Sequence, residues 1–373
     1  MSDQIYVGTR KGLFTVKRTG GAQGSWTITR SAFLGDPVTL VHSEPGGQRI
    51  HVALDLGHFG VKTHISEDAG ETWNETDAPQ YPEQPEGTVD MDMFKNIPIP
   101  WTTKAIWAFA NGTPDQAGRM WCGTIPGGLF RSDDGGASWD LVRSLWDHPD
   151  RKKWFGGGAD FPAIHSILVD PRDGKHVIAG VSCGGVWETH DDGETWAQGA
   201  QGMRADFLPP DQSMVPDSQD PHLLVACESA PDSMWTQHHC GIFRTTKGCG
   251  NWEEVTDVEP SAFGFAVAVH PRDADTAWFV PAIKDQTRYP AGGQVVVTRT
   301  RDGGKSFDIL REGLPQEHAY DLVYRHSLDI DESGDRLAFG STTGALWVTE
   351  DQGDSFEQIS GHLPPVYCVR FTR

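Results

Sequence analysis

Residues 132–139 read Ser-Asp-Asp-Gly-Gly-Ala-Ser-Trp, and the pattern Ser/Thr-x-Asp-x-Gly-x-Ser/Thr-Trp/Phe recurs along the chain. We call this pattern the octet. Complete copies begin at Ser66, Ser132, Thr189, Thr300 and Thr349. A further copy at residues 245–252 has Lys247 in place of the aspartate and Cys249 in place of the glycine. The recurrence indicates a chain built from similar units.

The residue types of the octet suit a tight turn between two strands. An aspartate side chain accepts hydrogen bonds from backbone N–H groups just ahead of it and so closes the turn. The glycine two positions later adopts a backbone angle that other residues resist. The terminal Trp or Phe begins the next strand and packs between neighbouring sheets. We therefore predict that the octet aspartates stabilise the fold and do not bind a ligand.

Each octet follows short apolar runs that are typical of strands. Before the octet at Thr189, such runs occur at residues 176–180 and 185–188, and another run at 167–170 precedes a polar turn. Each repeat therefore predicts four strands, A to D, with the octet at the C–D turn. Four-stranded repeats of about 40–50 residues are typical of propeller blades. The octets predict six blades.

The two ends of the chain predict a seventh blade. Residues 5–26 supply strands B, C and D without a strand A, and residues 366–371 form a lone strand. The last strand would complete the first blade, close the ring and remove a sheet edge. We expect one all-β domain over residues 1–373, a seven-bladed β-propeller of four-stranded antiparallel blades closed by the C-terminal strand.

The octets resemble those of the Asp-box (BNR) repeat superfamily, which includes sialidases, Asp-box xyloglucanases and the photosystem II stability factor family. The chain looks most similar to bacterial BNR-repeat glycosyl hydrolase-like proteins, and the resemblance extends through the octets over nearly the whole chain. It implies the fold more strongly than an activity, because the octet is a structural element. For a sialidase it implies six blades and an Arg-Ile-Pro motif, so true sialidase activity is not expected here.

The charge of the chain excludes several partners. The net charge is −21 and the isoelectric point is near 5.0, so nucleic acid and anionic membranes are not expected to bind. No signal sequence precedes the first strand, no apolar run approaches membrane-spanning length, and the six cysteines include no C-x-x-C pair. We expect a cytoplasmic protein with reduced thiols and no cofactor; its oligomeric state is not indicated.

Three motifs resemble functional sites. Residues 180–184 match G-x-S-x-G, but a strand follows where the nucleophile elbow needs a helix, so a B–C hairpin turn is favoured. Residues 304–306 resemble the end of a phosphate-binding loop and belong to an octet. The group His238, His239 and Cys240, with Cys249, could ligate a metal, but it lacks the paired short spacings of zinc sites. A polar loop without a metal is favoured there.

Long loops predict the face that carries a functional site. The B–C and D–A connections share the face opposite the octets. D–A loops around 74–104, 140–163 and 197–212 are long, and so are B–C loops around 228–240 and 281–293, whereas the D–A loops after the last three octets are short. Long loops in a compact repeat fold are usually functional. We predict a site at the channel mouth on this face, near blades 3 to 7.

Candidate residues come from these loops and from the inner strands. The catalytic candidates are Asp160 and His165, which flank the entry to the inner strand of blade 4, and Asp321, in a polar run at 319–326 that we expect to be the inner strand of blade 7. His165 could act as an acid or base near neutral pH, with Asp160 or Asp321 as its carboxylate partner. The candidate ligand-binding residues are Asp90, Asp92, Trp101, Trp107, Trp154, Trp235, His239, Arg288, Tyr324 and Arg325.

The candidates have a structural alternative as well as a functional one. The tryptophans that the repeat does not explain could stack on a sugar or simply pack the loops, and Arg325 could clamp an anion. The polar groups could form a satisfied network around channel water.

Three function classes remain open. The favoured one is a glycosyl hydrolase-like propeller that binds a carbohydrate-type or other small-molecule ligand. Such a protein could hydrolyse its ligand by means of two aspartate carboxyl groups that flank the bond. The second is a non-catalytic binding or assembly propeller resembling the photosystem II stability factor family. The third is another enzyme, such as a lyase or lactonase, that uses channel histidine and aspartate residues.

Overall fold

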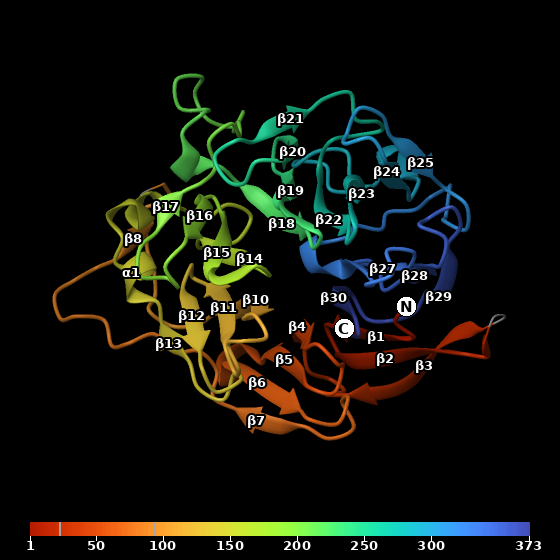
Figure 1. Cartoon of the computed structure of the whole chain (residues 1–373), viewed down its shortest axis with the longest axis horizontal. Coiled ribbons are helices and arrows are strands. Elements are labelled where there is room, and N and C mark those ends of the chain that lie inside the picture. The colour runs from red at the N-terminus through yellow and green to blue at the C-terminus, as the bar shows by residue number, and fades with distance from the viewer. Residues whose placement is uncertain (22–23, 93) are drawn as a thin grey trace.

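The computed structural model describes residues 1–21, 24–92 and 94–373. Within these residues the chain forms seven four-stranded antiparallel sheets, arranged as blades around a common centre (Figure 1). The predicted seven-bladed β-propeller is confirmed.

The first blade contains both ends of the chain. Its inner strand is β30 (Val366–Phe371), and β1 (Gln4–Thr9), β2 (Gly12–Thr19) and β3 (Ser25–Ala32) follow outward. β30 pairs antiparallel with β1 from Ile5↔Phe371 to Thr9↔Val366. The predicted closure by the C-terminal strand is therefore confirmed, and the two termini lie close together in Figure 1.

The other six blades follow in chain order, each running outward from its first strand. Blades 2 to 4 are formed by β4 (Val38–Ser43), β5 (Ile50–Asp55), β6 (Val61–Ser66) and β7 (Asn74–Thr76); β10 (Ala105–Asn111), β11 (Met120–Ile125), β12 (Leu129–Ser132) and β13 (Asp140–Leu141); and β14 (Ala163–Asp170), β15 (Asp173–Ser182), β16 (Gly185–Thr189) and β17 (Ala197–Gln198). Blades 5 to 7 are formed by β18 (Pro221–Cys227), β19 (Ala230–His238), β20 (Gly241–Thr245) and β21 (Glu253–Val255); β22 (Gly264–His270), β23 (Asp273–Pro281), β24 (Val297–Thr300) and β25 (Asp308–Leu310); and β26 (Leu328–Ile330), β27 (Leu337–Gly340), β28 (Leu346–Thr349) and β29 (Glu357–Ser360).

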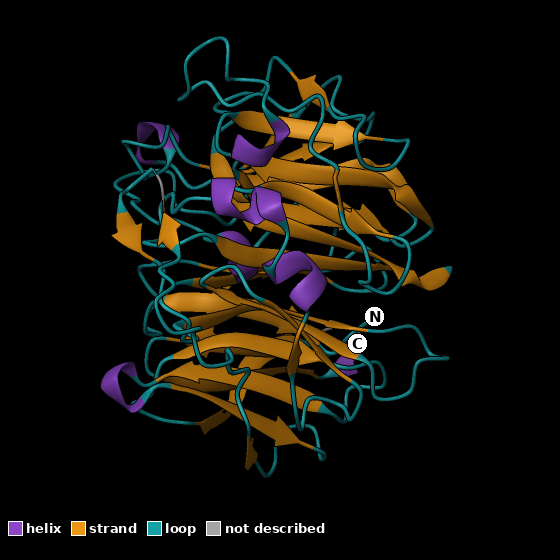
Figure 2. Cartoon of the chain, turned by 90° about the vertical axis from the view of Figure 1, so that its left-hand side faces the viewer, coloured by secondary structure: helices purple, strands orange, loops and turns teal. Residues whose placement is uncertain are grey.

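The connections carry the little remaining regular structure, which Figure 2 shows as short helices beside the sheets. It consists of the two-stranded sheet β8 (Met91–Asp92) and β9 (Ile97–Pro98), the helix α1 (Arg143–Trp146), and the 3-10 helices η2 (Gly57–Phe59), η3 (Pro149–Lys153), η4 (Pro216–Ser218), η5 (Ala291–Gly293) and η6 (Arg325–Ser327). Among the described residues, no helix combines the length and the apolar character needed to cross a bilayer.

The octets form the C–D turns with the predicted bonds. In residues 132–139, Asp134 Oδ1 accepts hydrogen bonds from Ser132 Oγ (2.7 Å) and from the backbone N–H of Ser138 (2.9 Å). Asp134 Oδ2 accepts from Ser138 Oγ (2.6 Å), and Ser132 Oγ accepts from the backbone N–H of Gly136 (2.8 Å). The same bonds recur in the other complete octets.

Aromatic side chains at the ends of the octets join neighbouring blades. Trp252 is buried, and its Nε1 donates to the carbonyl of Gly199 in the connection from blade 4 (2.9 Å). The incomplete octet at 245–252 has no aspartate, and Thr245 Oγ1 instead donates to the carbonyl of Gly248 (2.8 Å). The aromatic position is therefore retained where the aspartate is lost.

Two expectations about the connections are wrong. Residues 228–240 are not a B–C loop, because β18 and β19 pair down to Cys227↔Ala230 and leave only a short turn between them. Trp235 therefore lies in a B strand and is fully buried. Residues 319–326 are not the inner strand of blade 7, which is β26; they precede it, so the D–A connection after blade 6 is long. Their last two residues begin the 3-10 helix η6, and sheet pairing in this blade starts only at Leu328.

Candidate functional site

A cavity of about 480 Å³ opens on the face opposite the octets. Its walls come from the first residues of the inner strands and from the B–C and D–A connections. Aromatic, basic, histidine and acidic side chains line it, namely Trp107, Phe265, Tyr324 and Tyr367, Arg10, Arg288 and Arg325, His222, His239 and His326, and Asp55 and Asp220. A volume of this size is typical of small-molecule sites.

Arg325 lies at the start of η6 and forms no ion pair with any other residue that the structure describes. Its guanidinium carbon is 4.7 Å from the centre of the Trp107 ring and 5.6 Å from that of Phe265. Its Nε atom is buried and has no hydrogen-bond partner among the described residues. Burial lowers the pKa of Arg325, but an arginine stays protonated at neutral pH. The cavity wall thus carries a cation that the protein holds between aromatic rings.

A second arginine of the cavity is partly neutralised. Arg288, in the B–C connection of blade 6, donates from Nη2 to Asp285 Oδ1 (2.6 Å). Its guanidinium carbon lies 5.6 Å from the centre of the Phe265 ring, on which Arg325 also lies. Arg10, in the turn between β1 and β2, is exposed at the rim. The cavity therefore gathers three arginines, beside Asp55 and Asp220, in a chain whose net charge is −21.

Asp220 meets two histidines at one side of the cavity. Asp220 precedes β18, His222 is the second residue of β18, and His239 follows β19. Asp220 Oδ2 lies 3.3 Å from His239 Nδ1 and 3.7 Å from His222 Nε2. Although burial would raise it, the contacts with the two histidines hold the pKa of Asp220 well below its usual value. Burial lowers the pKa of His222, so its ring is neutral at pH 7.

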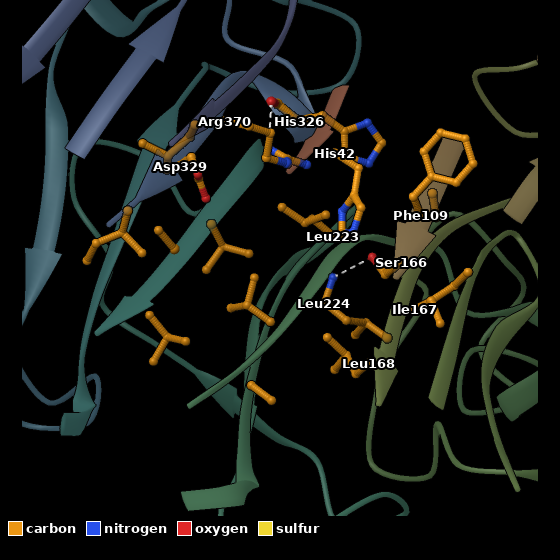
Figure 3. Close-up of a pocket in the computed structure, with 18 of the residues that line it drawn as sticks. His42, Phe109, Ser166, Ile167, Leu168, Leu223, Leu224, His326, Asp329 and Arg370 are labelled. Atoms are coloured by element: carbon orange, nitrogen blue, oxygen red, sulfur yellow. Dashed lines mark hydrogen bonds between the residues drawn. The ribbon is translucent and has the colours of Figure 1, made fainter. Parts of the chain in front are cut away.

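Beneath the mouth lies a second cavity of about 270 Å³ along the inner strands (Figure 3). Apolar residues such as Ile167, Leu223 and Leu224 line it together with histidine, acidic and basic residues, among them His42, Asp329 and Arg370 (Figure 3). Trp107 and His326 line both cavities. Polar groups therefore line the channel both at the mouth and in this inner section.

His165 lies in the wall of the inner section and not at the mouth. Its Nδ1 is hydrogen-bonded to Ser166 Oγ (2.7 Å), and its buried Nε2 has no partner among the described residues. Burial, together with the charge of Arg325, holds the pKa of His165 well below its usual value. His165 is thus neutral at pH 7, which does not suit the acid–base role expected near neutral pH.

The carboxylates expected to partner His165 lie outside both cavities. The backbone carbonyl of Asp160 accepts from Lys95 Nζ (3.3 Å) in the connection that precedes β14. Asp321 Oδ1 accepts from Ser341 Oγ (2.7 Å), which fastens the connection before β26 to the end of β27. The structure therefore does not bring Asp160, His165 and Asp321 together. Asp160 and Asp321 lie in long loops, and the local sequence does not determine the path of such loops.

Asp90 and Asp92 hold loops in place. Asp90 Oδ2 pairs with Arg151 Nη2 (2.6 Å), and both side chains are buried. Asp92 is fully buried, and its Oδ2 accepts from the backbone N–H of Gly156 (2.6 Å). Their bonds join the connection before blade 3 to the connection before blade 4, and neither residue lines the cavity.

Three of the candidate tryptophans are packing residues. Trp154 is buried, with its ring centre 5.5 Å from that of Trp187. Trp101 meets Trp146 edge-on at 5.4 Å. Trp235 Nε1 donates to the carbonyl of Ala274 in the next blade (3.0 Å). Trp107, His239, Arg288, Tyr324 and Arg325 are the candidates that do line the cavity.

Several lining residues were missed from the sequence. His222, Phe265 and Tyr367 are each the second residue of an inner strand, in β18, β22 and β30. A polar or aromatic residue at the second position of an inner strand was the sequence signal that could have identified them. Ser182, within the G-x-S-x-G match, lies at the end of β15 in the predicted hairpin and donates to Asp220 Oδ1 (3.0 Å).

Comparisons with known proteins support the fold. No protein-family model matches the chain. The chain is 25% identical over 293 residues to the oligoxyloglucan-reducing end-specific xyloglucanase of Emericella nidulans, a match over 69% of this chain and 33% of that protein. The chain thus spans about a third of the length of this relative.

Many solved structures are similar in fold, and two of them illustrate the likeness. An ancestral GH74 enzyme matches with a TM-score of 0.58 and 17% identity, over 87% of this chain and 38% of that one. YCF48 from Cyanidioschyzon merolae matches with a TM-score of 0.56 and 15% identity, over 94% and 92% of the two chains. At these identities the likeness concerns the β-propeller fold alone.

Proposed function

We propose that this protein binds a small anionic carbohydrate, such as a sugar acid or a sugar phosphate, in the cavity at the channel mouth. The observation that carries the proposal is Arg325, a cation on the cavity wall without an acidic partner among the described residues. Among the described residues, the charge of Asp220 acts on Arg325 without a direct ion pair. Burying a charge without a direct partner is costly, and a carboxylate or phosphate of a ligand would relieve that cost with charge-assisted hydrogen bonds.

The remainder of the wall suits a sugar ring. Trp107, Tyr324 and Tyr367 present aromatic surface to a cavity that also holds Arg288 and Asp55 as polar partners. Aromatic faces pack against the apolar faces of sugars, and a few polar groups fix their orientation. The 25% identity to a protein named as a xyloglucanase supports a carbohydrate as the ligand class.

Binding is better supported than glycoside hydrolysis. Glycosidases use two carboxyl groups that flank the bond, one of them with a raised pKa. The carboxylates of this cavity are Asp55 and Asp220, and the pKa of Asp220 is lowered. Asp220 Oδ1 is also occupied by the Ser182 hydroxyl and the Cys183 backbone N–H. We therefore propose that the anionic ligand is held and that these carboxyl groups do not hydrolyse a glycosidic bond.

A comparison of charged and neutral sugars tests the proposal. Glucuronate and glucose 6-phosphate would each be titrated calorimetrically beside glucose, at low and at high salt. We expect the two anions to bind more tightly than glucose, and high salt to weaken the binding. Binding of glucose as tight as that of both anions would contradict the proposal. If neither glucuronate nor glucose 6-phosphate binds, the proposal is contradicted as well, and the non-catalytic assembly propeller is favoured.

A further inference from the structure

We infer that Asp220, His222 and His239 form a site for one divalent transition metal ion, with Zn²⁺ as the best match, at the edge of the cavity. These three residues bring one possible ligand atom each to within 4.8 Å of one another. The inference does not depend on the proposed carbohydrate binding, because it concerns different side chains and a different ligand.

The spacing of the ligand atoms suits a metal better than it suits direct bonding. Asp220 Oδ2 is 3.3 Å from His239 Nδ1 and 3.7 Å from His222 Nε2. A charge-assisted hydrogen bond would be shorter, about 2.7–2.9 Å. Ligand atoms placed at about 2.0–2.2 Å from a tetrahedral Zn²⁺ are about 3.3–3.6 Å apart. The observed separations are close to that range.

The bonds behind the ligands orient each one toward the same point. His222 Nδ1 contacts the carbonyl of Gly264 at 2.7 Å, which fixes the proton on Nδ1 and leaves the Nε2 lone pair facing Asp220. Asp220 Oδ1 accepts from Ser182 Oγ (3.0 Å) and from the backbone N–H of Cys183 (3.1 Å), which leaves Oδ2 free. Such outer bonds to carbonyls and hydroxyls are typical of metal ligands.

His239 completes the set from the neighbouring strand. The pairing of Pro221 with His238 in β18 and β19 places Asp220 opposite His239, whose backbone N–H donates to the carbonyl of Asp220 (2.9 Å). His239 Nε2 faces Asp285 Oδ2 at 3.8 Å, so its Nδ1 is the nitrogen directed at Asp220. The sheet register itself therefore holds two of the three ligands together.

Two of the three groups are buried, and all three face the cavity. Asp220 and His222 are each only 3% exposed. Because all three residues line the cavity, a bound ion would have a coordination position open to a ligand there, as catalytic zinc sites do.

The other histidine and cysteine groupings do not offer this arrangement. His238, considered from the sequence, accepts the backbone N–H of Asp220 at Nε2 (3.0 Å), and Cys240 Sγ accepts that of Asp206 (3.2 Å). Neither side chain belongs to the cluster at Asp220.

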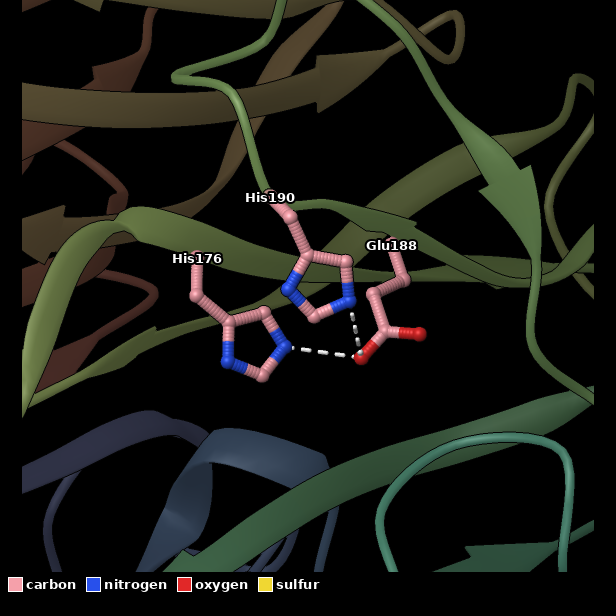
Figure 4. Close-up of side chains that lie close together, drawn as sticks. All are labelled: His176, Glu188 and His190. Atoms are coloured by element: carbon pink, nitrogen blue, oxygen red, sulfur yellow. Dashed lines mark hydrogen bonds and ion pairs between the residues drawn. The ribbon is translucent and has the colours of Figure 1, made fainter.

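A second cluster, His176, Glu188 and His190, is shown in Figure 4. The two ring nitrogens of His176 contact Asp170 (3.0 Å) and Glu188 (2.7 Å). The bond with Glu188 raises the pKa of His176 despite partial burial, which favours a protonated ring. The His190 side chain is 69% exposed. This cluster is an ion-pair network on the surface and serves as an internal control.

Metal titration of the full chain tests the inference. After chelator treatment, Zn²⁺ would be titrated calorimetrically and Co²⁺ by visible absorption, with no sugar present, so that this result is separate from the carbohydrate test. We expect one ion per chain and the intense visible bands of low-coordinate Co²⁺. His239→Ala, on a partly exposed turn, should weaken binding about tenfold or more, and His190→Ala should leave it unchanged.

The same titration can overturn the inference. Zn²⁺ binding that is as tight in His239→Ala as in the parent would refute it, and so would the absence of binding by the parent. Loss of binding in His190→Ala would assign the metal to the other cluster. Asp220→Asn, checked for folding by circular dichroism, provides a second ligand variant that should also lose the Co²⁺ bands.

Discussion

Replacing Asp134 with alanine would test the structural role of the octets. The substitution removes the acceptor of three hydrogen bonds, from Ser132 Oγ, Ser138 N–H and Ser138 Oγ. Each such bond contributes about 0.5–1.5 kcal/mol net. Because the turn is exposed, water replaces part of the loss, and we expect the free energy of unfolding to fall by about 1–3 kcal/mol.

Urea unfolding followed by tryptophan fluorescence measures this change, and Asp133→Ala is the matched control. Asp133 carries the same charge beside Asp134, but its side chain is 61% exposed and forms only surface ion pairs. Such pairs contribute about 0–1 kcal/mol. Equal midpoints for Asp134→Ala and Asp133→Ala would refute the reasoning, as would a loss of ligand binding in folded Asp134→Ala.

Three further predictions concern pH, ring closure and the tryptophans. Hydrogen bonds lower the pKa of most octet aspartates to about 2, in each case against an opposing effect of burial that is strongest at Asp134. The stabilisation by these aspartates is therefore complete above the ordinary pKa of about 4 and is lost as the pH falls toward 2. Urea midpoints measured between pH 2 and 6 should drop in that window, and a flat profile would count against it. Deleting residues 366–371 exposes the edge of β1 and should cause aggregation detectable by light scattering; a monomeric, stable product would contradict the closure. Trp154→Ala should lower the free energy of unfolding by about 3–5 kcal/mol, because Trp154 is a buried packing residue, whereas Trp107→Leu should chiefly weaken anion binding. Thermal melting and ligand titration measure the two effects, and a stable Trp154→Ala with weakened binding, or a destabilised Trp107→Leu with normal binding, would contradict these roles.

The fold was predictable because its signals are local. Each octet fixes one turn through bonds among residues four or fewer apart, as at Asp134, so the copies could be counted along the sequence. The N-terminal blade lacked an inner strand and residues 366–371 formed a surplus strand, so the sequence predicted that the surplus strand completes the first blade. Trp235 was misplaced because its hairpin turn is shorter than its polar residues suggested.

The site was predictable in place more than in detail. Loop lengths indicated the face, and Trp107 and Arg325 do line a cavity there. Asp160 and Asp321 do not, because the paths of long connections depend on contacts such as Lys95 with residues 157–160 that no local pattern encodes. Asp220 and His222 were missed because their partners come from another strand and another blade.

The central claim is that Arg325 holds the anionic group of a ligand. Titration of the tightest-binding sugar anion into the parent, Arg325→Met and the exposed-site control Arg301→Met tests it most directly. Hydrogen bonds to a charged group contribute about 1.5–3 kcal/mol, so the account predicts a Kd about 10- to 150-fold higher for Arg325→Met alone. An unchanged Kd for folded Arg325→Met, or an equal loss in Arg301→Met, would contradict it.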